Sequence, residues 1–243
     1  ETLFKGDADK VKEYANQAYQ TVGISANDYM EQVTSFSASL LSSLGGDTAK
    51  SADVANTAMV DMADNANKFG TDMGSIQNAY QGFAKQNYTM LDNLKLGYGG
   101  TKEEMQRLLN DAQQLTGVKY NIDNLSDVYN AIHAIQENLG VAKTTGEEAS
   151  KTFSGAFAMM KASAKNLLGN LSVGDGKAVA KNMGELVESA STFFFGNFIP
   201  MLQTLFSNLP EAIKTAVSTV TPKIKENVLP LISSIKETIF TGL

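Results

Sequence analysis

The chain has 243 residues and no cysteine, which excludes disulfide bonds, a cysteine nucleophile and a thiolate metal site. Its formal net charge is −6 and its lysines are scattered, whereas binding to the phosphate backbone of nucleic acid needs a basic face. We therefore expect no sequence-independent binding to nucleic acid, and we also expect no direct, sequence-specific contact with it. This length can form one large or two ordinary domains, each with its own core.

Apolar residues recur at helical spacing over residues 11–22 and 29–44, which predicts the first two helices. Asp7 and Ser25 precede these segments as candidate N-caps. Glycine accepts the left-handed conformation of a helix C-terminus, and it follows both segments, at Gly23 and at Gly45–Gly46.

The stretch from Asp53 to Leu115 predicts three more helices. The first carries an apolar stripe over residues 55–69, with Asp61 and Asp64 mostly off the stripe. The second continues a similar stripe over residues 76–94, until the glycines at 97, 99 and 100 end it.

The third helix of this stretch begins with a capping box. Thr101 is the expected N-cap, and Glu104 stands three residues on, so that each side chain can accept the backbone N–H of the other residue. Apolar positions continue over residues 105–115, and Gly117 follows. A sixth helix is predicted over residues 125–139. Because the connections are short, we expect residues 1–143 to form an all-α, antiparallel six-helix module.

Residues 144–243 are expected to form a long helix followed by an apolar, proline-interrupted helical region. Thr145 and Glu148 form a second capping box, which predicts a helix continuing to Leu171. After a break, the pattern resumes at Lys177 and becomes densely apolar. Prolines then divide the remainder into short helical pieces, at Pro210, Pro222 and Pro230.

No catalytic, cofactor-binding or metal-binding site is predicted. His133 is the only histidine and has no cysteine or second histidine to complete a metal site, so a structural or surface role is favoured, with a carboxylate partner left open. The sequence from Gly174 to Lys177 fails as a phosphate loop, because Leu171 and Ala178 replace its first glycine and its hydroxyl residue. Adjacent glutamates at helix starts are explained by the helix dipole.

The run from Phe193 to Leu209 is the candidate membrane or partner surface. A membrane span needs about twenty largely apolar residues, and this run is shorter and contains polar residues and Pro200. Core or oligomer packing is one interpretation, and an amphipathic segment that enters a bilayer after rearrangement is the other. The residues nominated for this surface are Phe193, Phe194, Phe195, Phe198, Ile199, Leu202, Leu205 and Phe206.

From about Phe4 to Leu171 the chain resembles tail tape measure proteins of long-tailed bacteriophages and prophages. The resemblance is carried by VKEYANQAYQTVGISANDYMEQVTSFSASLLSSLGGD, by AYQGFAKQNYTMLDNLKLGYGGT and by LSDVYNAIHAIQENLG. The chain begins at Glu1 without a methionine or an apolar leader, so we expect a central fragment of a longer protein.

The resemblance implies a structural protein rather than an enzyme. Such proteins fill the lumen of the tail tube, set its length during assembly with chaperones, and leave the tube ahead of the genome, with a proposed role at the host envelope. The implied partners are tail tube and distal tail proteins, assembly chaperones, further copies of the chain and the host membrane. The implied locations are the bacterial cytoplasm, the virion tail and, during infection, the host membrane.

A ruler works by extended length, and one continuous helix of 243 residues would span roughly 365 Å. The glycines between the predicted helices instead favour a chain that folds back on itself. We therefore expect a foldable module of the tape measure. The competing interpretation is a membrane-active or pore-forming helical protein that inserts through its C-terminal apolar helices.

Overall fold

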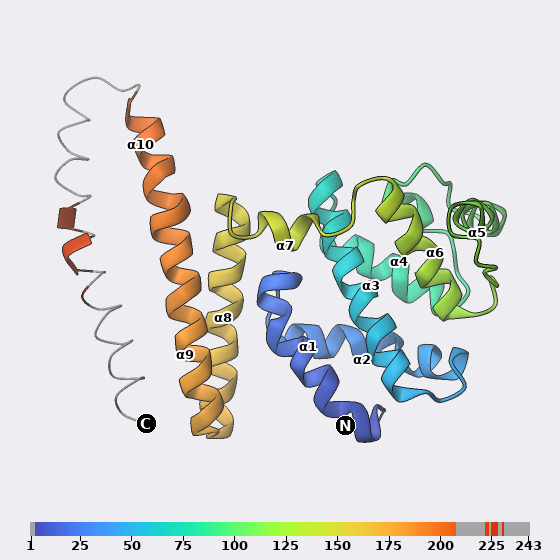
Figure 1. The fold of residues 1–243 in the computed structure, drawn as a ribbon, viewed down its shortest axis with the longest axis horizontal. Helices are drawn as coiled ribbons and strands as arrows, with labels where there is room; N and C mark the ends of the chain where they lie inside the picture. Colours follow the sequence, from blue (N-terminus) through green and yellow to red (C-terminus); the bar gives the residue numbers. More distant parts are fainter. Residues whose placement is uncertain (1–2, 208–221, 224, 228–229, 231–243) are drawn as a thin grey trace. The chain divides into compact units, whose positions relative to one another are not determined.

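A computed structural model describes residues 3–207, 222–223, 225–227 and 230 of the chain. These residues are helical, with connecting turns and no strand among them, which confirms the predicted all-α class (Figure 1). The chain divides into two compact units, Glu1–Gly146 and Glu147–Leu243.

The first unit contains six complete α-helices, α1 to α6. Five N-cap side chains accept a backbone N–H of the first helical turn, those of Ser25, Asp47, Asp72, Thr101 and Asn124. Left-handed glycines follow two of the helices, at Gly70 and Gly117. The helices are α1 (Ala8–Thr21), α2 (Ala26–Ser43), α3 (Thr48–Phe69), α4 (Met73–Phe83), α5 (Lys102–Thr116) and α6 (Leu125–Asn138).

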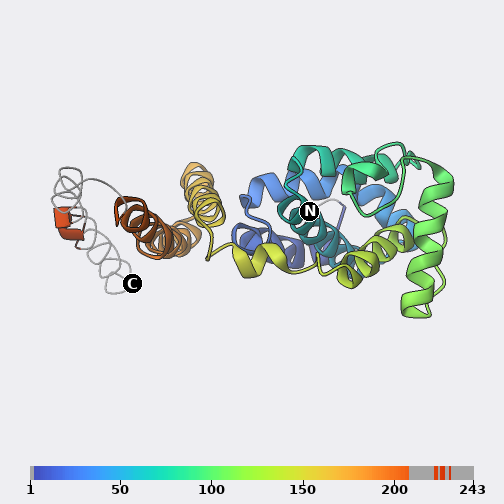
Figure 2. The same ribbon diagram turned by 90° about the horizontal axis from the view of Figure 1, so that it is seen from above.

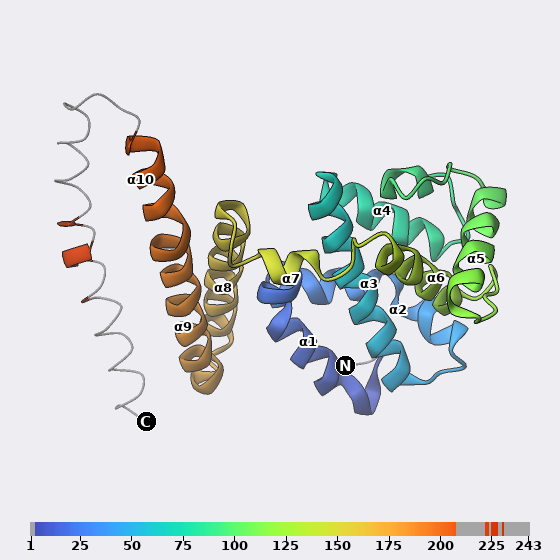
Figure 3. The ribbon, with the colours of Figure 1, turned by 45° about the horizontal axis from the view of Figure 1, so that its top comes forward.

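Helix α3 is the centre of this unit. It packs against α1, α2, α4 and α6, while α5 packs on α6 at the edge of the unit (Figures 2 and 3). An aromatic cluster lies between α2, α4 and α6, where the ring of Tyr129 meets Phe36 edge-on at 5.6 Å and lies 5.1 Å from Tyr80. The antiparallel order of the six helices stays a prediction.

The start of the first unit differs from the sequence prediction in two ways. Asp7 does not cap α1 with its side chain, and its carboxylate instead accepts the hydroxyl of Thr48. Helix α3 begins at Thr48 rather than near Asp53, because the Asp47 carboxylate accepts the N–H of Lys50, 2.9 Å away. A good N-cap therefore extends the central helix beyond its apolar stripe.

The single helix predicted over residues 76–94 is wrong. Helix α4 ends at Phe83, and a short 3-10 helix, η2, follows at Leu91–Leu94. The chain turns between them: Gln86 has a φ of 55°, and the Asn87 side chain accepts the N–H of Thr89. Asparagine favours such local turns over helix continuation. Leu91 and Leu94 are still buried. The apolar pattern therefore indicated correctly which residues are buried, but not that they belong to one helix.

The second unit contains a helical hairpin. Helix α8 (Phe153–Val173) ends at the left-handed Gly174, and Asp175 caps α9 (Gly176–Ser191) through the N–H groups of residues 177 and 178. Ser163 contacts Ser189, and Asn170 contacts Asn182, so the two helices run in opposite directions. A π-helix, η3 (Thr192–Phe198), and α10 (Ile199–Ser207) continue from α9.

The long helix predicted to start at Thr145 is also wrong. Residues Thr144–Glu148 form a separate short helix, α7, and α8 begins only at Phe153, where Thr152 caps it by accepting the N–H of Gly155. The N–H of Thr145 is bound by Asp64 of α3, so a tertiary contact replaces the expected capping box. The short pieces predicted after Pro210 lie outside the described residues, apart from 222–223, 225–227 and 230, which are helical.

Candidate functional site

The most unusual chemistry of the first unit lies on α3, where two carboxylates and one amide are buried. Asp61 is 1% exposed, and Asp64 and Asn65 are fully buried. The prediction that the two aspartates lie off the buried stripe is wrong for a physical reason: α3 is surrounded by four other helices, so more than one of its faces is covered. Buried carboxylates require partners, and the partners come from distant parts of the unit.

The first contact joins Asp61 to His133 of α6. Oδ1 of Asp61 lies 2.8 Å from Nδ1 of the imidazole, while Nε2 lies 3.6 Å from Glu137 on the next helical turn. Burial raises the pKa of Asp61 to about 6, although His133 opposes that shift. The hydrogen bond to Asp61 in turn raises the pKa of His133. The carboxylate partner that the sequence left open is therefore Asp61.

The second contact lies one helical turn further along α3 and α6. Nδ2 of Asn65 donates to Oε1 of Gln136 at 3.2 Å and to the carbonyl of Leu94 at 2.9 Å. Nε2 of Gln136 donates to the hydroxyl of Tyr80 at 3.3 Å, and the hydroxyl of Tyr129 donates to the carbonyl of Tyr80 at 2.9 Å. Burial raises the pKa of Tyr80 well above its ordinary value. We call the Asp61–His133 and Asn65–Gln136 pairs together the polar ladder.

The third contact joins Asp64 to the end of the first unit. Its two carboxylate oxygens accept the backbone N–H groups of Lys143 and Thr145, the latter at 2.7 Å. Burial raises the pKa of Asp64, while these two N–H groups oppose the shift. Lys143 has a φ of 69°, an unfavourable value for a lysine. The carboxylate therefore holds the chain in a conformation that its own sequence does not favour.

Both ring nitrogens of His133 face carboxylates. An aspartate bound to Nδ1 orients an imidazole for proton transfer at Nε2, as in hydrolases that use a histidine base. Here the neighbour of Nε2 is a carboxylate, Glu137, rather than a hydroxyl nucleophile. The contacts of this pair therefore connect α3 to α6.

Sequence reasoning missed Asp61, Asp64, Asn65 and Gln136 as interior residues. The available signal was the spacing of Asp61 and Asn65, which are four residues apart and lie on one face of a helix rich in alanine and methionine. Burial of a polar residue depends on which helices cover it, and that information is not local.

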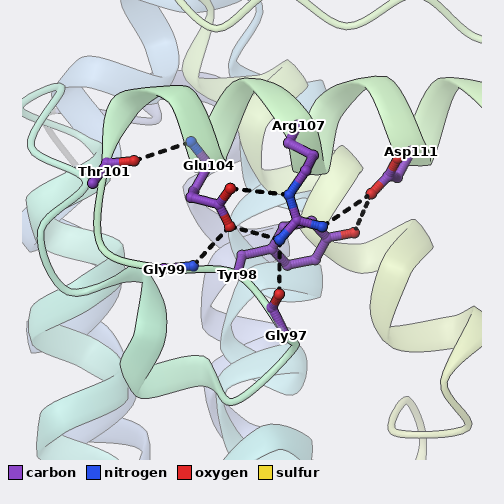
Figure 4. Close-up of polar contacts among 7 residues, drawn as sticks. All are labelled: Gly97, Tyr98, Gly99, Thr101, Glu104, Arg107 and Asp111. Carbon is purple, nitrogen blue, oxygen red and sulfur yellow. Dashed lines mark hydrogen bonds and ion pairs between the residues drawn. The ribbon is translucent and has the colours of Figure 1, made fainter.

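A second polar cluster fixes the loop before α5 (Figure 4). We call it the α5 clasp, and it consists of Gly97, Tyr98, Gly99, Thr101, Glu104, Arg107 and Asp111. The guanidinium of Arg107 donates to Glu104 and to the carbonyl of Gly97, and it lies 4.3 Å from the centre of the Tyr98 ring. Thr101 accepts the N–H of Glu104, which confirms half of the predicted capping box. The Glu104 side chain, however, accepts the N–H of Gly99 rather than that of Thr101.

The clasp uses its charged groups internally. Arg107 and the N–H of Gly99 lower the pKa of Glu104 to about 2. The Tyr98 hydroxyl donates to Asp111, and burial together with that hydrogen bond raises the tyrosine pKa to about 12. These pairings stabilise the turn from Gly97 to Thr101. The guanidinium of Arg107 is in contact with a carboxylate, a backbone carbonyl and an aromatic ring.

The nominated membrane or partner surface lies in the second unit and is partly buried. Phe193 is 6% exposed and Ile199 is 5% exposed. The Phe193 ring lies 5.3 Å from Phe157 and 5.7 Å from Phe198. Phe194, Phe195, Phe198 and Leu202 are half-buried, and the side chains of Leu205 and Phe206 lie outside the described set.

Asn197 is buried within this apolar run. Its Nδ2 donates to the carbonyls of Ser150 and Thr192, both at 3.0 Å. Thr192 is the first residue of the π-helix, so the side chain satisfies a carbonyl of the widened turn. Asn197 therefore has a packing role here.

No cluster of acidic or histidine residues suited to a metal ion occurs in the described part of the chain. Among the same residues, no helix combines the length and apolar character that a membrane crossing requires. No protein family, curated protein or solved structure matches the chain.

Proposed function

We propose that this chain is a structural, non-enzymatic segment of a phage tail tape measure protein. The observation that carries the proposal is the polar ladder, whose partners are 72 and 71 positions apart in the sequence. The buried acidic and amide groups serve to connect distant helices of one unit. This use of polar chemistry suits a protein whose task is mechanical and architectural, and the resemblance over residues 4–171 supports the same assignment.

Within that function, the first unit acts as a folded module rather than as measuring length. Helices α1, α2, α4 and α6 pack around α3, and α5 packs on α6, so this part of the chain does not contribute 1.5 Å per residue along an axis as an extended helix would. Its expected partners are the tail tube, the distal tail proteins and the tail assembly chaperones. Its expected location is the lumen of the tail.

The experiment is an in-frame insertion in the phage or prophage that encodes the chain. A flexible Gly-Ser segment is placed between α2 and α3, at Gly46, and tails are measured by electron microscopy. A folded module predicts tails of unchanged length, or failed assembly or infection. Tails that lengthen in proportion to the insertion would show that this region is measuring length and would contradict the module.

A second candidate, membrane contact through the second unit, is favoured by one observation. Leu168, Leu171 and Val173 near the end of α8 are 65%, 54% and 75% exposed. Apolar side chains on a surface are suited to lipid or protein contact. Limited proteolysis with and without anionic liposomes tests this function. Lipid-dependent protection of residues beyond 171 supports insertion, and identical digestion in both conditions counts against it.

A further inference from the structure

Residues 141–152 link the two units, and the start of this link is held against α3 by Asp64. Residues 141–145 belong to the first unit, and α7 begins among them, at Thr144, and extends past the boundary at Gly146. One side chain, that of Asp64, accepts two backbone N–H groups of this segment, while the hydroxyl of Thr144 donates to the carbonyl of Val141.

These two N–H groups depend on Asp64. The first N–H groups of a helix have no partner within the helix, and α7 has only five residues, so it gains little stability of its own. Asp64 is fully buried, which keeps water from replacing its hydrogen bonds. The positive φ of Lys143 adds a local conformational cost that the contact offsets.

We propose that Asp64 is a latch that keeps the link between the two units folded, and that its release frees the link while the helices of the first unit stay packed. Asp64 lies on the central helix, whereas the latched segment follows α6 and buries one apolar side chain, that of Val141. Residues 141–152, once freed and extended, would reach roughly 40 Å. The latch is a property of the chain itself and does not rest on the proposed phage function.

Residue-resolved hydrogen exchange on the full chain tests the latch. In the wild-type chain, the N–H groups of Lys143 and Thr145 are expected to exchange about tenfold slower than unstructured amides, or more slowly still. In Asp64→Asn, where only one oxygen can accept, their exchange accelerates about tenfold or more. Amides in the middle of α3 and α6 keep their wild-type protection.

Asp61→Asn is the matched control, because it also converts a buried α3 carboxylate to an amide but does not contact residues 143–145. Trypsin cleavage after Lys143 provides a second measurement and should accelerate in Asp64→Asn alone. The proposal is overturned if the two wild-type amides exchange at the unstructured rate. It is also overturned if both variants accelerate cleavage equally, or if α3 in Asp64→Asn loses as much protection as the link.

Discussion

Nδ1 of His133 lies 2.8 Å from Oδ1 of Asp61, and this contact connects the middle of α6 to the centre of α3. The carboxylate is buried, whereas 31% of the imidazole is exposed to solvent. The imidazole can therefore exchange protons with solvent, and its hydrogen bond opposes the rise in the pKa of Asp61 that burial causes.

The first prediction concerns the pH dependence of stability. Both groups have folded-state pKa values above their ordinary values of 3.8 and 6.5, so each contributes stability that is present below its unfolded pKa and is lost as the pH rises through its folded pKa. The free energy of unfolding should therefore fall by about 1–2 kcal/mol between pH 5 and pH 8.

Urea denaturation across this pH range measures the effect. In Asp61→Asn the histidine loses the main cause of its raised pKa, so the slope should flatten. A wild-type chain whose stability is constant or rises from pH 5 to pH 8 would contradict the assignment, as would an unchanged slope in the variant.

The second prediction concerns the other pair of the polar ladder. Asn65→Ala removes the donor to the Leu94 carbonyl and to Gln136, and both acceptors then lie unpaired in the interior. The variant should lose about 2–3 kcal/mol of unfolding free energy. Gln114→Ala on the exposed side of α5 is the control and should stay within about 0.5 kcal/mol of wild type. If both variants lost the same unfolding free energy, the Asn65–Gln136 pair would contribute no more to stability than an exposed side chain does.

The third prediction concerns the turn before α5. A Cβ at Gly100 would lie well inside van der Waals distance of the Thr89 carbonyl, whereas a Cβ at Gly99 would meet the Glu104 side chain at an ordinary 3.5 Å. Gly100→Ala should therefore cost about 1–3 kcal/mol, and Gly99→Ala should cost clearly less. Thermal unfolding of the two variants decides between them, and the reverse order would refute the packing of this loop against Thr89.

The fourth prediction concerns the α5 clasp. Because Arg107 is the main cause of the low pKa of Glu104, Arg107→Ala should move that pKa from about 2 toward its ordinary 4.5. The lowered pKa means that the clasp contributes stability above pH 4.5 and loses it as the pH falls toward 2. NMR titration of the Gly99 amide reports the change, with Lys102→Ala as the control. An unchanged midpoint in Arg107→Ala would contradict the role of the guanidinium.

Sequence patterns predicted the fold where the determinants are local. Ser25 and Thr101 cap their helices as expected, and the glycines predicted to follow the first two helices, Gly23 and Gly45, have positive φ values of 78° and 64°. Each of these features depends on residues within one helical turn.

The predictions failed where a distant residue decides the outcome. Thr145 looks like an N-cap, but its N–H is bound by Asp64, 81 positions earlier. Asp61 looks like a surface residue, but the helices around α3 cover it and His133 pairs with it. Such contacts exist only after the helices pack, so neither periodicity nor capping rules contain them.

Mass spectrometry of purified tails tests the central claim most directly. Tails are separated from capsids and from cytoplasmic protein in a lysate of the phage or prophage that encodes the chain, and tryptic peptides are then identified. A structural tape-measure segment predicts that peptides from residues 8–199 are enriched in the tail fraction. Peptides found in the lysate but absent from purified tails would contradict the proposed function.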